Sequence, residues 1–102
     1  MDPYFDTFNP KQRFFYDSKT LIKSDFPRVC TLNNLDTGES YKSLQEADCK
    51  NKKVRFLSMY LYPLPFGEGK STFFKTSPTE WTYPVPDTAS DAILEILCTK
   101  SK

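Results

Sequence analysis

The 102-residue sequence contains no histidine. Histidine is the side chain that most often acts as a general base near neutral pH, and it is the commonest metal ligand. A cysteine nucleophile needs such a base beside it, and the cysteines and carboxylates show no spacing typical of a zinc or calcium site. We therefore expect a protein that is not an enzyme, with no catalytic residues, no metal and no cofactor.

Long hydrophobic runs are absent as well. A helix that spans a membrane needs about 20 mostly apolar residues, and a secretory signal needs a basic start followed by an apolar stretch. The chain begins with Met1, Asp2 and Pro3 and has neither feature. The sequence therefore predicts no membrane span, no secretory signal and no membrane partner.

Cysteine is scarce, and the number of cysteines is odd. Cys30, Cys49 and Cys98 lie far apart in the chain. An odd number in a small protein argues against a disulfide framework and favours a reducing compartment, although a pair among the three stays open. Together with the missing signal, this predicts a cytoplasmic protein.

Glycine is rare too, whereas proline and aromatic residues are abundant. The chain has three glycines, eight prolines, nine phenylalanines, six tyrosines and one tryptophan. Aromatic and β-branched side chains fit pleated sheets, and proline divides a chain into short elements. We expect an α+β fold, with one domain over residues 1–102 and an antiparallel sheet of about five strands.

Turn residues separate the segments that would supply this sheet. An irregular N-terminal arm is expected over residues 1–10, held to the body or to a partner by Tyr4, Phe5 and Phe8. Asp36 and Gly38 are typical of a hairpin turn, because aspartate bonds to its own backbone and glycine adopts positive φ. The expected strands cover residues 12–16, 20–23, 28–33, 39–42, 54–62 and 71–75.

Two cap patterns predict helices. Ser43 and Glu46 have the spacing of a capping box, which predicts a short helix starting at Leu44. Thr88 and Asp91 form a second cap and predict a C-terminal helix over residues 88–99. Its apolar stripe should pack on the sheet and comprises Ala89, Ala92, Ile93, Ile96 and Leu97. The acidic side chains on its opposite face are Asp87, Asp91 and Glu95.

The net charge of +1 hides a basic middle region. Residues 50–75 carry six basic side chains and one acidic side chain, and each flanking region has a net charge of −2. In a strand over residues 54–62, strict alternation would place Phe56, Tyr60 and Tyr62 on one face. Basic residues beside aromatic rings are typical of a surface that contacts a partner. The candidate contact residues are Lys50, Lys52, Lys53, Arg55, Phe56, Tyr60, Tyr62, Lys70 and Lys75.

Two functions fit these features. The near-neutral charge and the surplus of aromatic residues favour a small intracellular inhibitor or adaptor that acts through a protein–protein interface, as a viral or phage accessory factor would. The alternative is a protein that binds single-stranded nucleic acid through the basic and aromatic residues of 50–75, with bases stacked on rings and cations on phosphates. A homodimer is compatible with either function.

Overall fold

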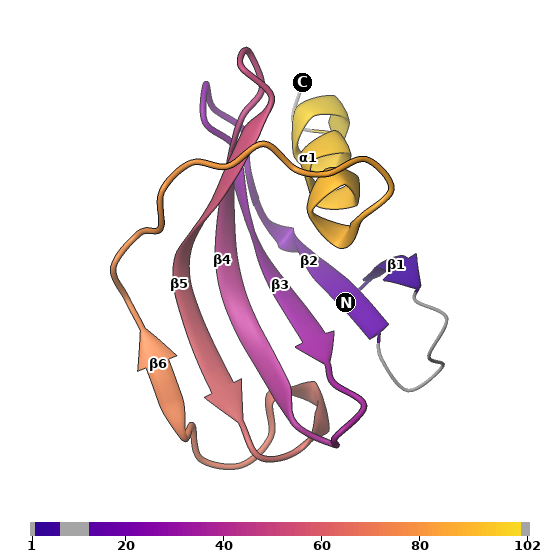
Figure 1. Cartoon of the computed structure of the whole chain (residues 1–102), viewed down its shortest axis with the longest axis vertical. Helices are drawn as coiled ribbons and strands as arrows, with labels where there is room; N and C mark the ends of the chain where they lie inside the picture. Colours follow the sequence, from indigo (N-terminus) through magenta and orange to yellow (C-terminus); the bar gives the residue numbers. More distant parts are fainter. Residues whose placement is uncertain (1, 7–12, 101–102) are drawn as a thin grey trace.

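The computed structural model describes residues 2–6 and 13–100. Its strands form one antiparallel sheet in the order β1-β2-β3-β4-β5-β6, so each strand pairs with its neighbours in sequence (Figure 1). The strands are β1 (Asp2–Asp6), β2 (Arg13–Ile22), β3 (Arg28–Asn34), β4 (Ser40–Asp48), β5 (Lys53–Tyr62) and β6 (Phe73–Lys75). A 3₁₀ turn, η1 (Pro65–Gly67), lies between β5 and β6, and a helix, α1 (Ala89–Lys100), follows β6. The α+β fold is confirmed, with six strands instead of about five.

The core lies between α1 and one face of the sheet. Helix side chains Ile93, Leu94 and Leu97 are buried there. They meet buried strand side chains that come from four neighbouring strands, namely Tyr16, Val29, Ala47 and Val54. The predicted packing of the C-terminal helix on the sheet is therefore confirmed. The buried stripe is turned slightly from the predicted one, since Leu94 is buried and Ile96 is only half-buried.

The predicted helix after Ser43 is wrong, because this segment is the middle of β4. The Ser43 hydroxyl lies 2.6 Å from the Thr31 hydroxyl on β3, so it does not cap a helix. Ser43, Gln45 and Ala47 are buried at every second position, which is the period of a strand. Pairing with β3 on one side and β5 on the other satisfies the backbone of β4 along its length. These long-range pairs outweigh the local capping pattern.

The first strands also differ from the prediction. Residues 12–16 and 20–23 were expected as two strands, but β2 runs through both with a register shift after Asp17. The side chain and backbone of Asp17 bond to Lys19 and Thr20, which places the expected turn inside a continuous strand. The N-terminal arm is not irregular over residues 2–6, which form β1 and pair with β2. The rings of Tyr4 and Phe5 contact Phe14, and Phe8 lies outside the described residues.

The hairpin between β3 and β4 is confirmed. Its strands pair in register from Arg28 with Glu46 to Asn34 with Ser40. Gly38 has a φ of +93°, the left-handed conformation that the turn requires.

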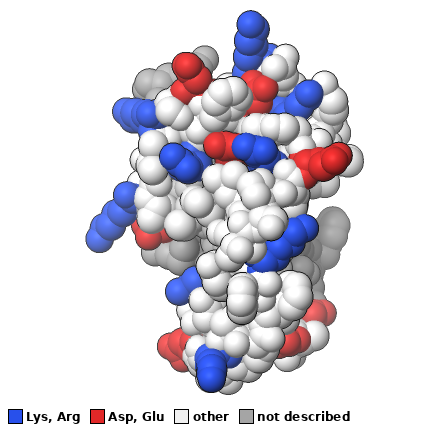
Figure 2. All heavy atoms as spheres, turned by 90° about the vertical axis from the view of Figure 1, so that its left-hand side faces the viewer, with Lys and Arg blue, Asp and Glu red and all other residues white. Residues whose placement is uncertain are grey.

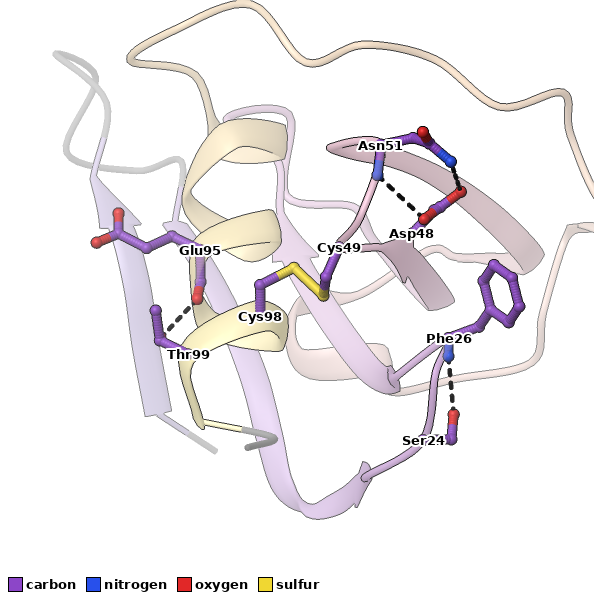
Figure 3. The surroundings of a disulfide bond; sticks show 8 residues. All are labelled: Ser24, Phe26, Asp48, Cys49, Asn51, Glu95, Cys98 and Thr99. Carbon is purple, nitrogen blue, oxygen red and sulfur yellow. Dashed lines mark hydrogen bonds between the residues drawn. A yellow bond between two sulfur atoms is a disulfide. The ribbon is translucent and has the colours of Figure 1, made fainter.

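A disulfide between Cys49 and Cys98 joins the turn after β4 to the end of α1 (Figure 3). The fold brings together two residues that are 49 positions apart in sequence. The pairing that the sequence left open is therefore Cys49 with Cys98, and this bond argues against the expected reducing compartment. Cys30 is the remaining thiol, and it lies half-buried on β3.

Removal of this disulfide should destabilise the protein. Replacing Cys49 and Cys98 together by serine should lower the free energy of unfolding by roughly 4 kcal/mol, since the bond closes a long loop in the unfolded chain. Denaturant unfolding without reductant measures the loss. Cys30→Ser is the matched control and should have a much smaller effect. A thiol assay of the denatured, unreduced protein should detect one free thiol. Three free thiols would contradict the pairing.

The core packing gives a second prediction. Ile93 is fully buried against the sheet, so Ile93→Ala should lower the free energy of unfolding by about 2–5 kcal/mol through lost burial and a residual cavity. Glu95→Ala, on the exposed side of the same helix, should change it by less than about 0.5 kcal/mol. Equal denaturation midpoints for the two variants would show that α1 does not pack as described.

Candidate functional site

A bulge in β5 decides which aromatic side chains share a face. The register between β4 and β5 skips Leu57, so the alternation of side chains shifts by one residue there. Phe56, before the bulge, lies on the side of α1 and lines a cavity with Ala89. Tyr60 and Tyr62, after the bulge, lie on the opposite side. The predicted row of Phe56, Tyr60 and Tyr62 is therefore wrong.

The face of the sheet opposite α1, which we call the outer face, contains a groove of about 450 Å³. Cys30 and Leu44, which are paired across β3 and β4, contribute to its lining. Phe74 of β6 stacks on Tyr60, with ring centroids 6.1 Å apart. The other lining residues are Asp17, Thr20, Thr31, Lys42, Ser43, Ser58, Tyr60 and Tyr62. The groove thus combines aromatic rings with hydroxyl groups and two charged side chains.

The segment around η1 covers the outer face at one end of the groove. The Ser40 hydroxyl accepts a hydrogen bond from the backbone N–H of Gly67, at 2.8 Å. The ring of Phe66 lies 5.8 Å from that of Phe15 on β2. Leu32, which the register places on the outer face, is only 2 % exposed. This end of the outer face is therefore closed by the chain itself.

The segment between β6 and α1 continues along the edge of β5. The backbone N–H of Thr79 donates to the carbonyl of Phe56 at 2.8 Å, and Thr82 exchanges two backbone hydrogen bonds with Val54. Figure 1 shows this segment, in orange, passing from β6 across the end of the sheet to α1. Since β6 pairs with the other half of β5, most of the edge of β5 is occupied by the chain itself.

Arg55 is fully engaged within the protein. Its guanidinium forms an ion pair with Glu46 on β4, at 2.8 Å, and lies 4.4 Å from the centroid of the Trp81 ring. The Trp81 ring also contacts Phe26, at 6.0 Å between centroids. Arg55 therefore holds the segment before α1 against the outer face.

Two lysines of the outer face lie over aromatic rings. The ammonium group of Lys42 is 5.5 Å from the centroid of Tyr62, and that of Lys53 is 5.2 Å from the centroid of Tyr83. Neither lysine has an ion-pair partner within 4 Å among the residues that the structure describes.

Hydrogen bonds from Asn51 and, to a smaller extent, the charge of Lys53 lower the pKa of the Asp48 carboxyl.

The predicted basic cluster does not assemble. Lys50 and Lys52 lie in the turn before β5, and Lys70 lies beyond its other end. Lys75 pairs with Met59 and so faces the side of α1. On the side drawn in Figure 2, basic and acidic side chains are interspersed over the surface. The predicted residues that do share the outer face are Lys53, Arg55, Tyr60 and Tyr62.

Sequence reasoning missed several residues of the outer face, namely Lys42, Phe74, Trp81 and Tyr83. Adjacent Phe73 and Phe74 were a usable signal, because neighbours on a strand point to opposite faces. Nothing in the sequence predicted that Trp81 would contact Arg55, since this contact depends on the path of the chain after β6.

A smaller cavity of about 50 Å³ lies beneath the start of α1. The Asn33 amide donates to the hydroxyl of Tyr41 at 2.8 Å, and its Oδ1 has no hydrogen-bond partner among the described residues. Burial raises the pKa of Tyr4, which also lines this cavity, well above its usual range. The volume suits one or two water molecules, so this cavity is part of the interior.

The comparison with protein families identifies the chain. A family model described as surface-adhesin protein E matches residues 4–99. The chain therefore belongs to this family. Neither the curated proteins nor the solved structures contain a match.

This membership corrects the functional predictions. The intracellular inhibitor or adaptor, the viral or phage accessory factor and the nucleic-acid-binding alternative are all wrong, because the family is one of surface adhesins. The predicted cytoplasmic location is wrong for the same reason. In the described part of the chain, no helix is long and apolar enough to span a membrane.

The contacts of Arg55 give a third prediction. In a double-mutant cycle, Arg55→Ala and Glu46→Ala should show a coupling of about 1 kcal/mol in the free energy of unfolding, because the pair is partly shielded from water. Arg55→Lys should not restore the wild-type free energy of unfolding, since only a planar guanidinium can stack on the Trp81 ring and a lysine ammonium group is not planar. Additive effects of the two alanine substitutions would contradict the ion pair.

Proposed function

We propose that this protein is a non-enzymatic surface adhesin that binds a protein partner through the outer face of its sheet. The observation that carries the proposal is the match of the surface-adhesin protein E family model to residues 4–99. In this proposal the protein acts at the cell surface or outside the cell, where adhesive contacts are made.

The chemistry of the outer face supports this role. Tyrosine, tryptophan and arginine are enriched among the residues that dominate binding energies at protein interfaces. The outer face presents Tyr60 and Tyr62, with Trp81 packed on Arg55 beside them, and Phe74 at its edge is 63 % exposed. The groove gives a partner side chain a concave place to insert. The opposite face offers less, because α1 covers its core.

The disulfide is consistent with a location outside the cytoplasm. Disulfides form and persist in oxidising environments and are rare where thiols are kept reduced. The Cys49–Cys98 bond holds α1 to the sheet, which keeps the fold intact at an exposed site.

The proposal can be tested with two adjacent phenylalanines. Phe73 and Phe74 are 61 % and 63 % exposed, but β6 directs them to opposite sides of the sheet. We expect Phe74→Ala to reduce adhesion severalfold when the protein is displayed on beads and washed over immobilised extracellular-matrix proteins. Phe73→Ala, which removes the same area from the side of α1, should leave adhesion close to the wild-type level.

Retention of the beads under flow measures the effect, and melting curves of both variants check that the fold is intact. Beads that carry wild-type protein and adhere no better than bare beads would contradict the adhesin function. An equal loss for both phenylalanine variants would contradict the assignment of binding to the outer face.

A further inference from the structure

We infer that the outer face binds an extended acidic segment of the partner protein, in which two carboxylates flank apolar side chains. This inference rests on the proposed function and adds the chemistry of the partner. It is derived from the charged groups on the outer face, from their spacing along β5, and from the groove that lies between them.

The charge balance of the outer face favours an acidic partner. The register of β2 to β5 places five basic and three acidic side chains on this face, namely Arg13, Asp17, Arg28, Lys42, Glu46, Asp48, Lys53 and Arg55. The three acidic groups are already engaged: Glu46 with Arg55, Asp48 with Asn51, and Asp17 with the backbone N–H of Lys19. Among the side chains that the structure describes on these four strands, the basic groups without an ion pair therefore dominate what a partner meets.

Lys42 and Lys53 are the basic groups best placed to receive carboxylates. Each ammonium group is positioned over a ring, Tyr62 or Tyr83, and such contacts limit the freedom of a long side chain. The Lys42 chain is also confined by Gly67, where a Cβ atom would collide with it. An ammonium group held in place loses less conformational freedom when a partner binds.

The spacing of the two lysines suggests the length of the segment. Lys42 is paired with Tyr60, and Lys53 precedes Tyr60 on β5 by seven residues, one of which is in the bulge. At about 3.3 Å per residue, the two positions are roughly 20 Å apart. Two carboxylates six positions apart in an extended segment lie on the same face and about 20 Å apart, so they would reach both lysines, and the residues between them would cross the groove.

The middle of the outer face disfavours a uniformly charged polymer. Between the two lysines lie the engaged Arg55–Glu46 pair and the aromatic and aliphatic lining of the groove. An apolar side chain can insert beside Leu44 and Tyr60, whereas an anionic group in the groove would lose water and meet the Asp17 carboxylate that also lines it. This favours an acidic peptide with an apolar centre over a sulfated polysaccharide.

A synthetic peptide tests this inference. The probe has glutamates at positions i and i+6, with leucine and tyrosine among the five residues between them, and the matched probe has glutamine in place of both glutamates. We expect the acidic peptide to bind the full-length protein, and its affinity to fall as salt rises. Lys42→Gln combined with Lys53→Gln should weaken binding roughly tenfold or more.

The control protein carries Lys50→Gln and Lys70→Gln, which remove the same charge from positions off the outer face. It should bind the acidic peptide like the wild type. The inference would be overturned if the glutamine peptide bound equally well, or if both double variants lost the same affinity. It would also be overturned if heparin bound more tightly than the acidic peptide, or if the acidic peptide did not bind at low salt.

The same variants separate this inference from the proposed function. If the Lys42/Lys53 variant retains full adhesion on beads while Phe74→Ala loses it, the outer face is adhesive but its partner segment is not acidic. If wild-type beads do not adhere but the acidic peptide binds as described, the adhesin function fails and the peptide site remains.

Discussion

The structure depends on one constraint: a single helix can cover only one face of a six-stranded sheet. Helix α1 buries Ile93, Leu94 and Leu97 against one face, and the Cys49–Cys98 bond holds its end there. The other face must be covered by loops or remain accessible. The η1 segment covers one end of that face, and the segment before α1 packs Trp81 on Arg55 at the other. The groove is what these two segments leave uncovered.

The bulge at Leu57 gives the groove its composition. Without it, Tyr60 and Tyr62 would lie on the same side as Phe56 and face α1. With it, both tyrosines join Leu44 and Cys30 on the outer face. A bulge is a property of the pairing between two strands, so a local alternation pattern cannot locate it. The aromatic composition of the outer face therefore results from one extra residue in β5.

Local turn and cap patterns predicted the secondary structure correctly where the long-range strand pairing agreed with them. The Asp36–Gly38 turn and the cap at Thr88 and Asp91 were predicted from short patterns, and both occur. The Ser43 capping pattern failed because β3 and β5 pair with both edges of that segment. The cysteine pair could not be assigned for a similar reason, since its geometry exists only in the folded chain. Of the candidate site, the sequence predicted that basic and aromatic residues would meet, but not that Arg55 would be neutralised by Glu46.

The central claim is that the outer face makes the adhesive contact. Hydroxyl-radical footprinting of the displayed protein, with and without the immobilised matrix proteins, measures it at individual side chains. Binding through the outer face should reduce the oxidation of Tyr60, Tyr62 and Phe74, with Phe73 unchanged on the opposite side of β6. Protection of Phe73 while the outer-face rings oxidise as in the free protein would show that the partner binds the side of α1 instead.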